Sequence, residues 1–257
     1  MPHEAHMGSL LLQLTYNGLV EGAILALAGL GATLCFGIQR VANFAHGDYM
    51  TVGAYAAFLV DVTWSTNLVV AAVGAIVATA ALAVGLHLVL LRPLRGRGLV
   101  ALSLITVGLG LVLRDLMFLL EGSQTRQYAF NQTAVLDLGF VRIAPAELWA
   151  GVAALVVVPA VAAMLAWTTV GKSMRAVADN RDLAEISGVD TDRIGLYVWI
   201  VAGALAGLAL GLVMEVSTWP GFFGGVPTQY QPVVGFVVLI LLLMFRPQGL
   251  LGKAQVL

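Results

Sequence analysis

Long runs of apolar residues, each close to the length of a membrane crossing, are the feature that most limits what this chain can fold into. A transmembrane α-helix needs about 20 consecutive, mostly apolar residues. Such runs occupy residues 10–38, 68–91, 99–120, 148–168, 194–214 and 232–246, and a shorter run occupies residues 49–60. In lipid each run must satisfy its own backbone hydrogen bonds, and the alternating pattern of barrel strands is absent. We therefore predict an all-α fold, a polytopic bundle of transmembrane helices.

The composition indicates that lipid, rather than water, is the main solvent of this chain. Of its 257 residues, 60% are hydrophobic and 11% are charged, whereas a soluble domain has about 25% charged residues. The formal net charge is −1, so there is no basic field that would attract nucleic acid. This composition excludes an ordinary soluble enzyme, a disordered chain and a nucleic-acid binder. We expect residues 1–257 to form a single transmembrane domain, with membrane lipid around it.

Lysine and arginine in short loops predict the sidedness of the helices. The loop 92–98 has three arginines and no acidic residue, which is the strongest cytoplasmic signal in the chain. The loop 169–193 has four Lys or Arg residues and is also predicted to be cytoplasmic, whereas the loop 121–147 has no basic excess. The resulting alternation places the region around Arg40 and the C-terminus in the cytoplasm.

A polar segment, RVANFAHGDYM at residues 40–50, interrupts the apolar pattern. Polar groups at membrane depth usually face a cavity or a partner, and helices broken by such groups form the midplane sites of transporters. We expect Gly47 to let the backbone turn, and Asn43 and Asp48 to cap the broken helix ends. On spacing alone, an interfacial loop that caps a helix explains the same residues equally well.

The segment 170–195 alternates charged and apolar residues with helical spacing, which predicts one or two short amphipathic helices. Its apolar stripe is predicted to contain Met174, Val177, Ala178 and Leu183. Gly188 is expected to end the first helix, because glycine is favoured just past a helix C-terminus. Such a segment either lies on lipid or docks a soluble partner, and its balanced charges favour docking.

Glu21 is the remaining candidate inside an apolar run, because no Lys or Arg shares its run. A protonated glutamate, or one that bonds to a neighbouring helix, explains this residue somewhat better than a functional role does. The sequence contains no catalytic motif, complete phosphate-binding loop or metal-ligand cluster. We therefore predict no enzyme activity, no catalytic residue, no metal and no cofactor, and any ATP would be bound and hydrolysed by partner subunits.

Four segments, in order along the chain, resemble one family of membrane proteins. They read GLGATLCFGIQRVANFAHGDYMTVGAY at 29–55, SLITVGLGLVLRDL at 103–116, VGKSMRAVADNRDLAEISGVDTDRIG at 170–195 and MFRPQGLLG at 244–252. The sequence resembles the LivH-like branched-chain amino acid permease family of ABC importers. The resemblance implies the fold of a type II ABC importer permease. It also implies that the chain passes branched-chain or other small amino acids while a partner subunit hydrolyses ATP.

The resemblance further implies a set of partners and a location. These partners are a LivM-like second permease, two ATP-binding subunits and a periplasmic or other extracytoplasmic solute-binding protein. The location is the cytoplasmic (inner) membrane of a prokaryote, as a multi-pass protein with a cytoplasmic C-terminus. We expect the translocation pathway, at the helix break, to involve Glu21, Asn43, Phe44, His46, Gly47 and Asp48. Coupling to the ATPase through the cytoplasmic segment 170–195 is expected to involve Gly171, Lys172, Met174, Arg175, Ala176, Asp179, Asn180 and Arg181.

One departure from the family concerns the region after Met214, where a Gly-rich segment with a re-entrant hairpin usually precedes the last helix and is absent here. Three other functions are compatible with the residues. The first is a urea or short-amide permease of the same family, the second is an ion-coupled secondary carrier, and the third is a non-transporting membrane scaffold. Co-purification with an ATPase separates the importers from the other two.

Overall fold

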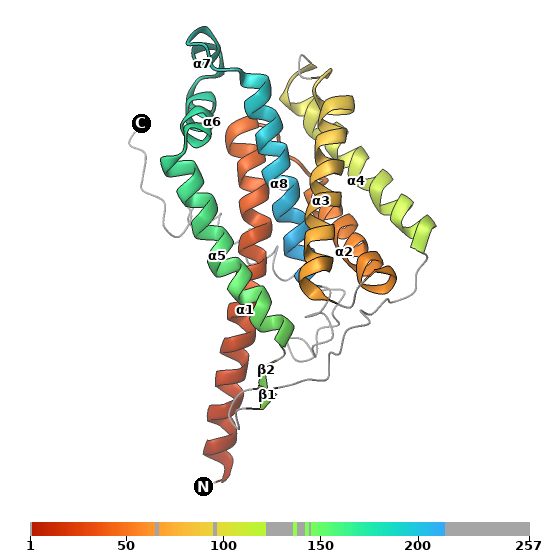
Figure 1. Cartoon of the computed structure of the whole chain (residues 1–257), viewed down its shortest axis with the longest axis vertical. Helices are drawn as coiled ribbons and strands as arrows, with labels where there is room; N and C mark the ends of the chain where they lie inside the picture. The colour runs from red at the N-terminus through yellow and green to blue at the C-terminus, as the bar shows by residue number, and fades with distance from the viewer. Residues whose placement is uncertain are drawn as a thin grey trace. The chain divides into compact units, whose positions relative to one another are not determined.

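The computed structural model of the protein is a bundle of α-helices (Figure 1). It describes residues 2–64, 67–94, 97–121, 136–137, 142–143 and 145–213, and every structural statement below concerns these residues. In chain order the elements are α1 (Pro2–Gln39), α2 (His46–Thr63), α3 (Leu68–Leu86), the π-helical turn η1 (His87–Leu91), α4 (Leu99–Glu121), β1 (Leu136–Asp137), β2 (Arg142–Ile143), α5 (Pro145–Trp167), α6 (Thr169–Asp179), α7 (Arg181–Ile186) and α8 (Thr191–Val213). The two short strands pair antiparallel.

Five of the described helices are long and apolar enough to cross a membrane. The corresponding segments are Thr15–Gln39, Val69–Leu91, Val100–Leu120, Leu148–Trp167 and Thr191–Ala209. They coincide with the first five long apolar runs of the sequence, so the predicted polytopic helical fold is confirmed. The predicted last run, 232–246, and the departure after Met214 lie outside the described residues.

Helix α2 differs from the short run 49–60 that the sequence predicted. It is one continuous helix of 18 residues, or about 27 Å, and it begins three residues before the predicted run. Its buried positions recur every three or four residues and include Tyr49, Gly53 and Ala57, and this face packs against α3 and α8. Counting apolar residues missed the first turn, because that turn is polar.

Helix α8 is the most enclosed of the five crossing segments, and it packs against α1, α2 and α3 (Figure 1). Small residues allow this close approach, which is how helices commonly associate in lipid. A Cβ atom added to Gly207 would lie 2.6 Å from the Ala75 carbonyl oxygen, and one added to Gly203 would lie 2.8 Å from the Ala83 Cβ. A Cβ added to Gly53 on α2 would lie 2.7 Å from the Gly207 Cα. These glycines therefore set the spacing of α2, α3 and α8.

The two loops that the Lys and Arg pattern places on one side of the membrane do lie together. Asp192, at the start of α8, accepts a hydrogen bond from Arg92 after η1 at 2.8 Å and one from Arg181 on α7 at 3.5 Å. In Figure 1 the α6–α7 pair, the α3–α4 connection and the start of α8 share the upper end of the bundle. We refer to this end, which carries Arg40, Arg92 and Arg181, as the basic end.

We expect Gly207→Val to destabilise the protein, because a larger side chain has no space between α8 and α3. Overpacking of this kind costs about 1–3 kcal/mol. Gly85→Val on α3 is the matched control, since Gly85 is exposed and an added Cβ meets nothing within 4 Å. Thermal unfolding of both purified variants in the same detergent measures the difference. Equal melting temperatures for the two variants would contradict this packing of α3 and α8.

Candidate functional site

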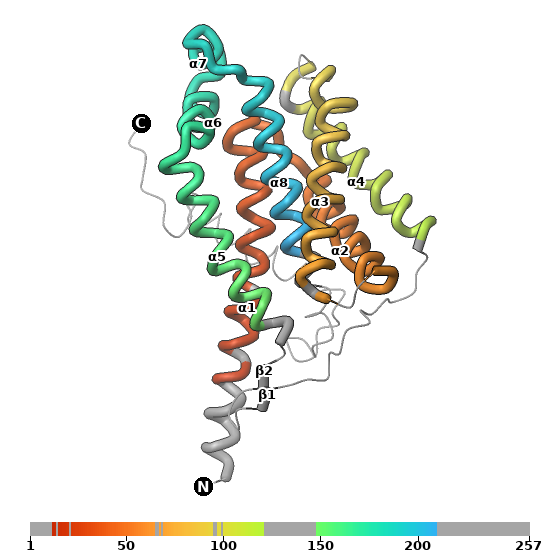
Figure 2. The backbone as a smooth tube through the Cα atoms, viewed as in Figure 1, coloured from red at the N-terminus to blue at the C-terminus, as the bar shows by residue number. Residues whose placement is uncertain are grey.

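The predicted helix break is present between α1 and α2 (Figure 2). Helix α1 ends at Gln39, residues 41–45 are not helical, and α2 begins at His46. Arg40, just past the end of α1, has a φ of +55°, and it is the one non-glycine residue with a positive φ in the described part of the chain. Helices often end on a residue of this conformation, usually glycine. Arginine therefore takes a position here where glycine would be less strained.

The break packs beside α4, away from both ends of this helix, which is long and apolar enough to cross a membrane. The Phe44 amide contacts Thr106 on α4, and Gly110 on α4 makes room for Asp48, whose carboxylate would clash with an added Cβ. Thr106 and Gly110 are about 10 Å and 16 Å along α4 from Leu99, at 1.5 Å per residue. Both lie well inside the crossing segment Val100–Leu120. This depth favours the broken-helix interpretation over the interfacial one.

Thr106 satisfies the backbone of the broken segment. Its hydroxyl accepts a hydrogen bond from the Phe44 amide at 3.1 Å. Its single proton points to one of two carbonyls, that of Ala42 at 3.0 Å or that of Ser103 in its own helix at 2.7 Å. A backbone group left unsatisfied in lipid costs several kcal/mol, so this one side chain on α4 stabilises the break.

The side chains of His46 and Asp48 bond to neighbouring helices. His46 Nε2 lies 3.0 Å from the carbonyl oxygen of Ala28 in α1, so this nitrogen carries a proton and donates it. Gly31 leaves space for the ring, because an added Cβ would lie 2.9 Å from His46 Cε1. Asp48 is 12% exposed and pairs at 3.3 Å with Arg114 on α4, whose side chain is 71% exposed. The break is therefore attached to α1 and to α4.

Three expected roles in the break are wrong. Neither Asn43 nor Asp48 caps α2, because the N-cap is Ala45 and no side chain caps that end. Both amide atoms of Asn43 are buried without a hydrogen-bond partner among the described residues. Gly47 lies in the first turn of α2, and an added Cβ would meet nothing within 4 Å, so no steric reason requires glycine there. Glu21 lies in α1, and its side chain is outside the described part.

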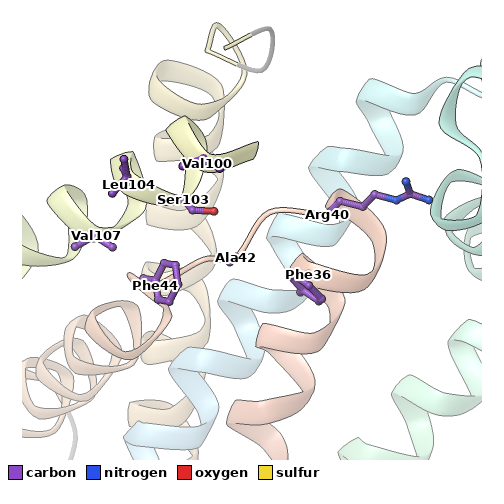
Figure 3. A pocket seen from close by; sticks show the side chains of 8 residues that line it. All are labelled: Phe36, Arg40, Ala42, Phe44, Val100, Ser103, Leu104 and Val107. Carbon is purple, nitrogen blue, oxygen red and sulfur yellow. The ribbon is translucent and has the colours of Figure 1, made fainter. Parts of the chain in front are cut away.

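An open groove of about 340 Å³ lies between the end of α1, the break and α4. It is lined by Phe36, Arg40, Ala42, Phe44, Val100, Ser103, Leu104 and Val107 (Figure 3). The Phe44 ring is 62% exposed there. Apolar walls with two polar residues offer good contact for hydrocarbon but few partners for the charged groups of an amino acid. Elsewhere in the described chain, no three His, Cys, Asp or Glu side chains gather as metal ligands would.

The segment 170–195, which the sequence predicts to be cytoplasmic, contains two short helices, α6 and α7, and the first turn of α8. Thr168 caps α6 by accepting a hydrogen bond from the Gly171 amide at 3.0 Å. Gly171 is buried against the backbone of Met164 and Leu165, where an added Cβ would clash. Met174 and Val177 are buried as the periodicity predicts. The structure therefore explains glycine at 171 by the tight turn between α5 and α6.

The junction between α6 and α7 differs from the sequence expectation in two respects. Asn180, in an extended conformation, ends α6 and also caps α7 by accepting from the Leu183 amide at 3.0 Å. Gly188, with φ +85°, follows the second helix and not the first. This kink rotates α7 relative to the predicted stripe, so Ala184 is buried and Leu183 is 61% exposed.

Arginine side chains attach α6 and α7 to the rest of the bundle. Arg175 donates to the backbone carbonyls of Leu165 and Ala166 at the end of α5, and Arg181 donates to Thr191 at 3.0 Å. Cations at helix C-termini are favourable because the last carbonyls carry partial negative charge. The exposed residues of the predicted coupling set are Lys172, Arg175, Ala176, Asp179 and Asn180.

Comparison with known proteins defines the class. A family model described as the permease component of branched-chain amino acid transport systems matches residues 14–219. The chain therefore belongs to this family of polytopic membrane permeases.

Relatives in bacteria and archaea match much of the chain. The high-affinity branched-chain amino acid transport system permease protein LivH of Escherichia coli K12 is 26% identical over 95% of this chain and 96% of its own length. BraD of Pseudomonas aeruginosa, described in the same terms, is 23% identical over 95% of this chain and 97% of its own. A probable LivH of Methanocaldococcus jannaschii is 30% identical over 76% of this chain and 65% of its own. No solved structure matches.

The LivH comparison covers 302 positions, more than the 257 residues of this chain. LivH of Escherichia coli therefore has residues within the matched region that have no counterpart here. The Gly-rich segment expected after Met214 would account for such a difference, but that position lies outside the described residues.

Sequence patterns alone predict neither the role of Thr106 nor the partners of Arg40 and Arg114. Thr106 carries a weak signal, since it is a hydroxyl residue in the otherwise apolar run 99–120. Arg40 and Arg114 look like charges that snorkel to the membrane surface. Their actual partners are far away in the sequence, so local patterns give no indication of them.

We expect two nearly isosteric substitutions at the break to affect stability in opposite ways. Asn43→Leu removes buried polar atoms that lack a partner, so its melting temperature should equal or exceed that of the wild type. Thr106→Val leaves the Phe44 amide without an acceptor, which should cost about 1–3 kcal/mol. Thermal unfolding in one detergent compares the two. Equal destabilisation by both substitutions would contradict the assigned hydrogen bonds.

Proposed function

We propose that this chain is the membrane-spanning subunit of an ABC importer that carries branched-chain or other small amino acids and is driven by ATP hydrolysis in partner subunits. The observation that carries this proposal is the family match over residues 14–219. Full-length relatives named as branched-chain amino acid permeases support the substrate class. In this proposal the chain itself has no enzymatic activity and binds no cofactor.

The proposed assembly contains a LivM-like second permease, two ATP-binding subunits and an extracytoplasmic solute-binding protein. We place the basic end in the cytoplasm, since short loops rich in Lys and Arg remain there. The location is then the cytoplasmic membrane of a prokaryote, with the C-terminus on the cytoplasmic side. Residues 1–257 would act as one permease domain, with the coupling segment at 170–195.

The proposed pathway runs beside the helix break, where Asn43, Phe44, His46, Gly47 and Asp48 lie. Buried polar groups in a membrane protein commonly mark such pathways. His46 and Asp48 are engaged by neighbouring helices, whereas the amide of Asn43 is free to bond a passing solute or water. Glu21 belongs to the same proposal through its place in α1.

The proposed docking element is the α6–α7 pair. Its buried members are Gly171 and Met174, and Arg181 is half-buried. Its exposed members are Lys172, Arg175, Ala176, Asp179 and Asn180. On α7 the apolar side chains of Leu183 and Ile186 are 61% and 85% exposed. Both lie at the basic end of the bundle, where water rather than lipid would surround them. A protein surface that covers them would remove this apolar area from water.

Purification of the tagged chain from its native membranes tests the proposal. We expect ATP-binding subunits to co-purify with it. After reconstitution, leucine uptake should require internal ATP and the binding protein, and a non-hydrolysable ATP analogue should stop it. Leucine uptake driven by an ion gradient without ATP would contradict the proposal and would indicate a secondary carrier. Uptake of urea or short amides in place of leucine would change the proposed substrate class but would leave the ATP-driven importer function unchanged.

The docking element has a test of its own. The double substitution Leu183→Ser and Ile186→Ser should weaken binding of the ATP-binding subunits by about a hundredfold or more. Burial of two side chains of this size contributes about 3–6 kcal/mol, and each 1.4 kcal/mol changes the affinity about tenfold. Arg97→Ser, in the α3–α4 connection at the same end, is the control and should retain them. Quantitative immunoblotting of the membrane fraction checks that insertion is unchanged. Full retention of the ATP-binding subunits by the double variant would contradict the proposed docking element.

A further inference from the structure

Arg40 connects two parts of the protein that are far apart in sequence. Its Nη2 atom lies 3.1 Å from the carbonyl oxygen of Ala178 and 3.3 Å from that of Asp179. These are the last carbonyls of α6, which have no partner within the helix. In Figure 3 the Arg40 side chain extends away from the end of α1 and away from the groove-lining residues of α4. The Arg40 guanidinium therefore caps the C-terminus of α6, the first helix of the proposed docking element.

The backbone of Arg40 indicates that the side chain, and not the turn, requires arginine at this position. A φ of +55° is strained for any residue with a Cβ and is unstrained for glycine. Glycine would end α1 with less strain, but it would leave the carbonyls of Ala178 and Asp179 without the guanidinium. The contact with α6 therefore offsets the strained conformation of Arg40.

The chain that follows Arg40 leads directly into the break. Phe44 is held by Thr106 on α4, and His46 then starts α2 and bonds to α1. Only five residues, 41–45, separate Arg40 from α2. A movement of the C-terminal end of α6 would therefore pull on a short segment that is anchored at membrane depth.

We propose that Arg40 is a positioning residue that makes the docking helix α6 and the helix break move together. A displacement of α6 by an ATPase is passed through the Arg40 guanidinium to residues 41–45, where it alters the hydrogen bonds to Thr106. This inference rests on the proposed function. It adds to that function a specific mechanical connection between the docking element and the pathway.

The variant Arg40→Gly separates this role from a merely structural one, because glycine suits the positive φ. In the reconstituted complex we expect an unchanged melting temperature and retained ATP hydrolysis, with leucine uptake per ATP reduced about fivefold or more, a typical size for a coupling residue. Arg40→Lys keeps a cation near the α6 carbonyls and should give an intermediate ratio. Arg97→Gly, which removes an exposed arginine from the same end, should leave the ratio unchanged.

Two results would overturn the inference in this assay. One is an unchanged ratio of uptake to hydrolysis in Arg40→Gly. The other is a parallel loss of hydrolysis and uptake, which would place Arg40 in docking rather than in transmission.

A distance measurement on the isolated chain tests the connection without any ATPase. Spin labels at Ala176→Cys on α6 and Gly47→Cys on α2, both exposed positions, would be placed in a Cys35→Ala background. Double electron–electron resonance in nanodiscs measures the distance between the two labels. The distance distribution should be narrow when residue 40 is arginine and broad in the Arg40→Gly variant. Identical distributions would refute the connection. If no ATP-binding subunit co-purifies, the proposed function fails, and this measurement still decides whether Arg40 ties α6 to the break.

Discussion

A backbone that leaves the helical conformation at membrane depth has no water to satisfy its amides and carbonyls, and the arrangement around residues 40–48 follows from this constraint. Thr106 on α4 supplies an acceptor for the Phe44 amide. The Ala28 carbonyl of α1 accepts a hydrogen bond from His46. Glycines at positions 31 and 110 leave the space that the His46 ring and the Asp48 carboxylate need. The broken segment can exist because helices on both sides provide its partners.

The rest of the bundle keeps these partners in place. Trp199 on α8 is fully buried. It contacts Tyr49 of α2 edge-on, with ring centroids 6.5 Å apart, and it stacks on His87 with centroids 5.4 Å apart. His87 begins η1, whose π-type hydrogen bond joins the Arg92 amide to the His87 carbonyl at 2.7 Å. This aromatic cluster fixes the start of α2 against α8, while glycine contacts bring α8 close to α3. The position of the break therefore depends on the packing of α8.

The basic end and the break differ in burial and in polarity, which suits two different functions. Arginines at the basic end bond to exposed helix termini and to Asp192, in contacts that individually contribute little to stability. Such contacts can rearrange when a partner binds. The break is enclosed by helices and contains the buried amide of Asn43, which has no hydrogen-bond partner in the described part of the chain. The fold tolerates this cost without an evident structural benefit. In the proposed importer, energy enters at the basic end and the solute passes beside the break.

Local patterns in the sequence predicted the apolar helices, a polar interruption at residues 40–50, and which loops share one end of the bundle. Those features depend on local composition, helical period and loop charge, which can be read within a few turns of chain. The packing of the helices was needed to show that the break lies beside α4, that Arg40 rather than Gly47 has the positive φ, and that Leu183 faces outward. The partners of the break lie 62 residues from Phe44 and 138 residues from Arg40. No periodicity within one segment specifies such contacts, because they depend on how separate helices pack.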